Sequence, residues 1–280
     1  MNSTPIAAGA TTVIAPRRGW HAVDWRELWA YRDLLYFLVR RDVKVLYKQT
    51  VLGFAWAIIR PVFSMTVFSV VFGRLAGVPS DGAPYPIFSF VALVPWTYLS
   101  TALTASTQSL VANANLLTKI YFPRLVIPLT PILAGLVDFA IAALVLGAMM
   151  AWYGIVPGVG LLVLPLLVLL MVLTATGAGL WLAALAIRYR DIKHAAPFLV
   201  QLAMYAAPVV WPASLVPDAY RLAYGLYPPA GVIEGFRAAL LGSTPMPWDL
   251  IGASAVSATL IAVSGIYYFR GRERAFADVA

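Results

Sequence analysis

The sequence predicts an all-α integral membrane protein: six transmembrane helices, an N-terminal amphipathic helix at the membrane interface, and re-entrant helices between the fifth and sixth spans. Of its 280 residues, 61% are hydrophobic and only 11% are charged, whereas soluble domains carry about 25% charged residues. Apolar stretches of about 20 residues, the length that crosses a bilayer, recur along the chain. Basic residues flank these stretches, as topology signals do.

The N-terminal region divides into a tail and a helix. Residues 1–24 are small and polar, include proline and glycine, and lack the apolar core of a signal peptide, so we predict a flexible cytoplasmic tail. Residues 25–52 combine basic side chains with apolar residues at helical spacing, which are Leu28, Tyr31, Leu35, Leu38 and Val45. Basic amphipathic helices of this kind lie in the membrane interface.

Six spans are expected within residues 53–270. Their ranges are 54–72, 87–110, 125–152, 161–187, 195–211 and 250–269. Pro61 is expected to kink the first span. The second ends in Ser and Thr, so we expect that half to face protein or a cavity. The small residues of TATGAGLW in the fourth permit close helix contact, and Pro208 and Pro212 interrupt the short fifth span.

Two connecting segments have helical character. Residues 113–124 are long enough for a helix, with Asn113 or Asn115 as possible caps. Residues 217–242 are split by two consecutive prolines at 228–229 into amphipathic pieces too short to cross a bilayer. Their position between two spans predicts re-entrant or surface helices.

Charge placement predicts the topology. With six spans, sixteen of the twenty Lys and Arg residues fall on the side that carries both termini. The positive-inside rule therefore places residues 1–24 and the basic tail 271–280 in the cytoplasm.

The sequence lacks several catalytic motifs. It has no cysteine, no GxxxxGK[ST] phosphate loop and no GxSxG motif, and its two histidines, His21 and His194, lack metal-ligand spacing. We therefore predict no catalytic residue, metal site or cofactor in this chain, and no nucleic-acid partner. The acids expected on the outer surface fall in separate loops, which weakens an enzyme hypothesis; they are Asp81, Asp218, Glu234 and Asp249.

Two features within the spans allow alternatives. Asp138 is an acid deep in the third span, where ionisable residues are usually functional. Because no second acid or histidine accompanies it for a proton relay, we favour a hydrogen bond to a neighbouring helix. Trp56 and Phe63 are seven residues apart and share one helix face. Such a face either stacks on sugar rings or packs against other helices.

Several stretches occur in the order typical of one family, from about Asp33 to Phe269. They are RRDVKVLYKQTVLGFAW, PYP, LVPW, SLVANANLLTKIYFPRLVIP, LVDF, RYRDIKH and IEGFRAALLG. Together they resemble the membrane subunit of ABC-2 type exporters of O-antigen, teichoic acid and capsule. The resemblance implies a homodimeric permease of the bacterial inner membrane that works with two copies of a separate ATPase subunit, which binds ATP and magnesium. It also implies a polysaccharide cargo linked to undecaprenyl pyrophosphate, most often O-antigen.

The resemblance also implies roles for particular residues. Residues 113–124 are similar to the coupling helix that docks on the ATPase, and 217–242 to external gate helices. The expected coupling residues are Asn113, Asn115, Lys119, Tyr121 and Arg124; the expected gate residues are Tyr227, Pro228, Glu234 and Arg237. We expect Arg40, Arg41 and Arg60 near the substrate entrance, and Trp56 and Phe63 along its path.

The chain departs from the family pattern at two places, and other functions stay open. Arg60 stands where relatives often have Gln, and LYPPAG at 226–231 replaces what is often Asn-Pro. The alternatives are an ABC-2 exporter of a drug or another lipid, an integral-membrane glycosyl or acyl transferase, and a membrane scaffold.

Overall fold

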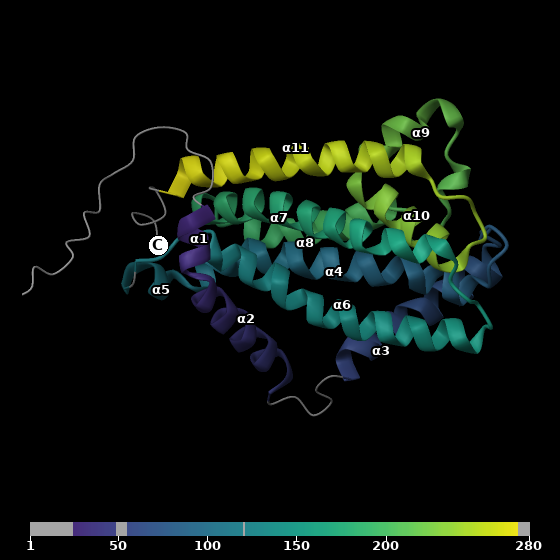
Figure 1. Ribbon diagram of the computed structural model, residues 1–280, viewed down its shortest axis with the longest axis horizontal. Coiled ribbons are helices and arrows are strands. Elements are labelled where there is room, and N and C mark those ends of the chain that lie inside the picture. The colour runs from purple at the N-terminus through teal and green to yellow at the C-terminus, as the bar shows by residue number, and fades with distance from the viewer. Residues whose placement is uncertain (1–24, 49–54, 120, 274–280) are drawn as a thin grey trace, which may run out of the picture.

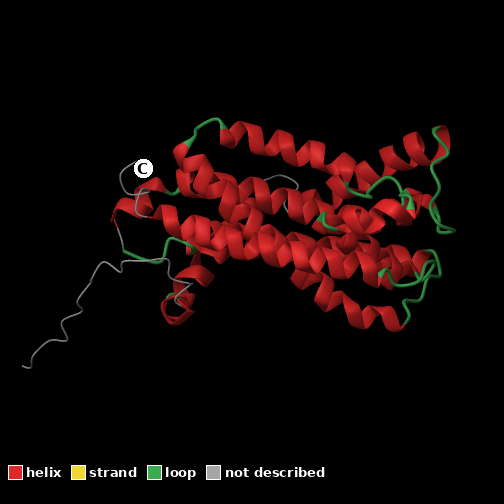
Figure 2. Ribbon diagram, turned by 90° about the horizontal axis from the view of Figure 1, so that it is seen from above, coloured by secondary structure: helices red, strands yellow, loops and turns green. Residues whose placement is uncertain are grey.

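A computed structural model describes residues 25–48, 55–119 and 121–273. Every regular element in these ranges is a helix. The long helices run side by side in an elongated bundle, with α1, α5 and the last turns of α11 at one end and α9 at the other (Figures 1 and 2). We call these the α5 end and the α9 end.

Five helical stretches in the described ranges are long and apolar enough to cross a membrane. They are α3 (Ala55–Phe68) continued by the π-helix η1 (Ser69–Leu75), α4 (Tyr85–Ala112), α6 (Val126–Trp152), the short 3-10 helix η2 (Val159–Val163) continued by α7 (Leu164–Arg188), and α11 (Trp248–Arg272). These match the first, second, third, fourth and sixth predicted spans. Pro61 lies inside α3, and residue 54 lies outside the described ranges.

The predicted fifth span is shorter than expected. Helix α8 (Ile192–Ala206) has 15 residues and ends before Trp211, so it falls below the length of a span. Ala207 is extended, with φ −79° and ψ 147°, because the residue before a proline is disfavoured in the helical region. Residues 207–213, which we call the 207–213 segment, therefore cross the α9 end as largely buried chain that is non-helical as far as Pro212, and Ala213 begins a 3-10 helix.

Helix α4 is the centre of the bundle. It packs against α3, α6, α7, α8 and α10, and its residues 87–96 are all buried, as an all-round apolar sequence favours. In its Ser/Thr-rich half, Ser106 and Thr107 are fully buried, and the Ser106 hydroxyl donates to the Pro128 carbonyl of α6 at 3.2 Å. This half was predicted to face protein or a cavity; Ser106 and Thr107 face protein, whereas Thr101 and Gln108 are exposed.

The N-terminal amphipathic region forms two helices, α1 (Trp25–Ala30) and α2 (Arg32–Tyr47), which meet at Tyr31. Leu38 is buried, and Leu28, Tyr31 and Leu35 are half-buried against the same cluster. Val45, the last of the apolar residues at helical spacing, is 67% exposed and does not share this packing. Residues 49–52 of the predicted helix lie outside the described ranges.

The remaining short helices lie at the two ends. Helix α5 (Ala114–Lys119) follows α4 at the α5 end, and the 3-10 helix η3 (Ala213–Leu215), α9 (Asp218–Gly225) and α10 (Pro228–Leu241) follow α8. The prediction that two short pieces meet at the paired prolines is confirmed. The prediction that both are amphipathic is wrong for α10, because its residues 228–240 are all buried.

Candidate functional site

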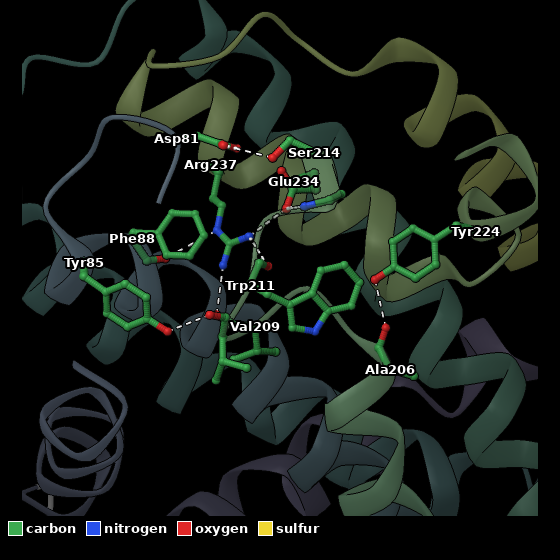
Figure 3. A network of polar contacts seen from close by, with 12 residues as sticks. Asp81, Tyr85, Phe88, Ala206, Val209, Trp211, Ser214, Tyr224, Glu234 and Arg237 are labelled. Atoms are coloured by element: carbon green, nitrogen blue, oxygen red, sulfur yellow. Dashed lines mark hydrogen bonds and ion pairs between the residues drawn. The ribbon is translucent and has the colours of Figure 1, made fainter. Parts of the chain in front are cut away.

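Two of the predicted gate residues form a buried ion pair on α10. Arg237 Nη1 lies 2.6 Å from Glu234 Oε1, and the two side chains are 3% and 8% exposed (Figure 3). The sequence predicted Glu234 among the exposed acids of the outer surface, and its burial contradicts that exposure. The spacing of three residues brings Glu234 and Arg237 to one helix face, and that face points into the protein.

The Arg237 guanidinium also contacts two other parts of the chain. It donates to the carbonyls of Val209 at 2.9 Å, Trp211 at 3.2 Å and Phe88 at 3.4 Å, and lies 3.6 Å from the centre of the Phe88 ring (Figure 3). A guanidinium has five N–H donors in a fixed planar arrangement. One side chain of α10 therefore binds both the 207–213 segment and α4.

Further hydrogen bonds hold the 207–213 segment and its neighbours. Tyr85 of α4 donates its hydroxyl to the Val210 carbonyl at 2.6 Å. The Ala213 amide donates to Glu234 Oε1 at 3.1 Å. The next residue, Ser214, donates to Asp81 Oδ1 at 2.9 Å. We call these contacts and those of Arg237 the Arg237 cluster.

Two tyrosines bind the last turn of α8. The hydroxyl of Tyr227 donates to the Ala203 carbonyl at 2.9 Å, and that of Tyr224 to the Ala206 carbonyl at 2.8 Å. Both carbonyls belong to the last turn of the helix, where backbone donors run out; that of Ala203 also accepts from the Ala207 amide at 3.1 Å. The predicted gate residues Tyr227 and Pro228 thus begin α10 directly beside α8.

At the α5 end, the predicted coupling segment is joined to α2. Asn113 ends α4, and its side-chain amide donates to the Ser109 carbonyl at 2.8 Å. Its side-chain oxygen accepts from Arg41 Nη2 at 3.3 Å, while Arg41 also pairs with Asp42 at 2.8 Å. The structure thus brings Arg41 to the predicted coupling segment, while Arg40 is exposed.

The same segment contacts α1 and the end of α11. Tyr121 donates its hydroxyl to Glu27 at 3.4 Å, and burial together with the Glu27 charge raises the pKa of Tyr121, so the phenol stays protonated as a donor. Arg124 donates to the backbone carbonyl of Glu273. Of the other predicted coupling residues, Lys119 is exposed and Asn115 lies within α5.

One predicted entrance residue, Arg60, and the two predicted path residues, Trp56 and Phe63, are exposed on α3. Trp56 and Phe63 are 43% and 69% exposed, and Arg60 is exposed with its guanidinium 5.6 Å from the centre of the Trp56 ring. Both aromatic side chains are therefore exposed on this chain, Phe63 more than Trp56. Helices α2 and α3 each pack against α6.

The surroundings of Asp138 differ from those predicted. Its residue is half-buried on α6, but its Oδ1 atom is buried and has no hydrogen-bond partner in the part of the chain that the structure describes. The expected hydrogen bond from this oxygen to a neighbouring helix is wrong.

Most partners in the two end regions carry no signal in the sequence. Tyr85, Phe88, Glu27 and Glu273 carry no motif that points to these contacts. The one local signal was the acid–base pair three residues apart in α10, which predicts an ion pair on a helix.

Known proteins are similar to this chain over most of its length. Residues 33–241 match the family described as ABC-2 type transporter. The O-antigen export system permease protein RfbA of Myxococcus xanthus is 30% identical over 259 residues, which cover 90% of this chain and 97% of that protein. An O-antigen export system permease protein RfbA of Klebsiella pneumoniae is 24% identical over 248 residues, covering 88% of this chain and 95% of that protein.

Proposed function

The chain belongs to the ABC-2 type transporter family, and from this premise we propose that it is the permease subunit of an ATP-driven exporter of O-antigen polysaccharide linked to undecaprenyl pyrophosphate. The observation that carries the proposal is its 30% identity with the RfbA export permease of Myxococcus xanthus along nearly the whole of both chains. A permease of this kind provides the route through the membrane, while a partner hydrolyses ATP.

The partner is a separate ATPase subunit present in two copies, with ATP and magnesium bound to it. Its docking site is the coupling segment at 113–124. The contacts of this segment support a role in force transmission, because it is bonded to α2 through Arg41, to α1 through Tyr121 and to α11 through Arg124. A displacement of the segment would therefore reach three helices directly.

The cargo passes along the exposed face of α3. Trp56 and Phe63 offer aromatic surface to sugar rings, and Arg60 offers positive charge to the pyrophosphate. Arg40 and Arg41 lie near the entrance on the same side as the ATPase. Exposure of an aromatic and cationic face within an apolar helix supports this assignment, since a purely lipid-facing helix needs no charge.

The working form is a homodimer. In the most apolar stretch of α3 and η1 only 6% of the residues are buried within the chain, against 28% to 72% in the other four candidate spans. Helix α8 also exposes Phe198, Leu199 and Leu202. A second copy would cover part of this surface and enclose a passage wide enough for a polymer.

The protein lies in the inner membrane with both termini in the cytoplasm. Basic residues at the α5 end support this orientation, because Lys119 and Arg124 lie there together with Arg188, Arg270 and Arg272 at the last turns of α7 and α11.

The test is purification of the tagged chain from its own membranes in mild detergent. We expect an ATP-binding subunit in equal amount, together with undecaprenyl-linked sugar. In a strain that lacks this gene, the chain should restore O-antigen at the cell surface. Recovery of the chain alone, with glycosyl or acyl transfer that needs no ATP, would overturn the proposal.

A further inference from the structure

We propose that Arg237 is a positioning residue that fixes the 207–213 segment to α4 and α10, so that these three parts move as one body at the α9 end during transport. The inference rests on the proposed export function and adds to it a statement about which parts of the predicted gate stay together. It follows from three properties of the Arg237 cluster.

The first property is that the backbone carbonyls of the 207–213 segment need hydrogen-bond donors from elsewhere in the protein. Pro208 and Pro212 have no N–H, and Ala207 is extended, so the segment cannot continue α8. Val209 and Val210 are 0% and 8% exposed, so water does not satisfy their carbonyls. Within the depth of a membrane, non-helical backbone persists only where protein groups or a water-filled cavity bind its polar atoms.

Arg237 and Tyr85 supply these donors. Arg237 binds the carbonyls on either side of Val210, and Tyr85 binds the Val210 carbonyl itself. Three successive carbonyls of the segment are thereby satisfied from α10 and α4. Lysine could not take the place of Arg237, because its three donors radiate from one atom.

The second property is charge compensation. A buried guanidinium is unfavourable unless an opposite charge and further acceptors accompany it. Glu234 provides the charge at 2.6 Å and also accepts the Ala213 amide, which lies at the end of the same segment. The pair therefore holds the segment at two positions, at Val209 and at its end at Ala213.

The third property is the spread of partners along the chain. Phe88 of α4 and Arg237 are 149 positions apart, and Asp81 and Ser214 are 133 apart. Sliding α4 past α10 at the α9 end would break the buried hydrogen bond and the ring contact between Arg237 and Phe88 and, with the segment held to α10, the Tyr85–Val210 bond as well. We therefore expect the passage for the cargo to open elsewhere than between these two helices.

A labelling experiment tests the positioning role without reference to transport. The natural chain has no cysteine, so Val209→Cys introduces a single, buried thiol. We expect a maleimide to leave it unlabelled in the parent and to label it at least ten-fold more in Arg237→Met and Arg237→Lys. Leu215→Cys, at an exposed position, is the control and should react equally in all three backgrounds.

Arg237→Lys keeps a positive charge beside Glu234, so it decides the matter if Arg237→Met fails to fold. An unlabelled Val209→Cys in a folded Arg237→Lys protein, judged by its elution in size-exclusion chromatography, would overturn the positioning role.

A cross-link tests the movement as one body. Asp81→Cys with Ser214→Cys, bridged by a short bifunctional methanethiosulfonate, should export O-antigen at the rate of the same protein after reduction. A several-fold loss of export on bridging, regained on reduction, would show that the two sides must separate and would overturn the inference. If neither the parent nor the reduced protein restores surface O-antigen, the export function itself fails, while the labelling result still decides the role of Arg237.

Discussion

A methyl group added to Gly265 of α11 would lie 3.0 Å from the Cα atom of Gly177 on α7. A methyl group added to Gly177 would lie 2.5 Å from the Cα atom of Ala262. The two helices therefore meet backbone to backbone at this crossing. Such an approach needs residues without side chains and increases van der Waals contact between helices that both face apolar surroundings.

This crossing predicts that Gly177→Ala destabilises the protein. The added methyl group meets backbone that cannot rotate away, and overpacking of this kind costs about 1–3 kcal/mol. We expect a melting temperature in detergent several degrees lower. Gly252→Ala is the matched control on α11, because nothing lies within 4 Å of its added methyl group. Equal melting temperatures of the two variants would contradict the close crossing.

The contact between α2 and the coupling segment predicts different effects for two adjacent arginines. Arg41→Ala removes the bond to Asn113, so we expect reduced stimulation of the partner ATPase by the permease in a reconstituted complex. Arg40 is exposed, so Arg40→Ala should leave ATPase stimulation unchanged. Similar losses in both variants would indicate that their shared charge, and not the Asn113 contact, matters.

The exposed aromatic face of α3 predicts a defect in export without a defect in assembly. We expect Trp56→Ala and Phe63→Ala each to lower surface O-antigen several-fold, because sugar stacking is lost, while co-purification of the ATPase persists. Trp152→Ala is the control, since Trp152 is 88% exposed at the end of α6. Unchanged O-antigen in both α3 variants would remove them from the cargo path.

Hydrophobic length predicted most of the fold. Five of the six expected spans correspond to helices that are long and apolar enough to cross a membrane. A bilayer requires such segments whatever their tertiary partners are. The exception is the predicted fifth span. Residues 195–211 are mostly apolar, but Pro208 forces Ala207 out of the helical region. The two prolines predicted an interruption of this span, and the structure ends α8 at Ala206, two residues before the first of them.

The candidate sites were predicted only in part, for a physical reason. Glu234 and Arg237 are polar, so periodicity alone assigns them to a surface. Their burial depends on Val209 and Phe88, which approach only once α4, α8 and α10 have packed. Pairings over such sequence distances leave no local pattern. The exposure of Trp56 and Phe63 could not be predicted from the sequence either, because helix packing and contact with a sugar both favour aromatic residues.

The junction of α9 and α10 depends on a side chain of α11 that no motif marked. Ser254 is fully buried; its hydroxyl accepts from the Gly231 amide at 3.1 Å and donates to the Gly225 carbonyl at 2.9 Å. One hydroxyl thus joins the last turn of α9 to the first turn of α10 and holds both against α11.

Ser254→Ala should therefore destabilise this junction. The change leaves a buried amide and a buried carbonyl unsatisfied, and each such group costs about 1–3 kcal/mol. We expect a lower melting temperature and faster hydrogen exchange confined to residues 218–235. Thr259→Ala is the control on the same helix, because its exposed hydroxyl bonds only to the Ala255 carbonyl one turn earlier. Faster exchange spread evenly over α11 would instead mean that Ser254 acts through its own helix, and the bridge between α9 and α10 would not be the cause.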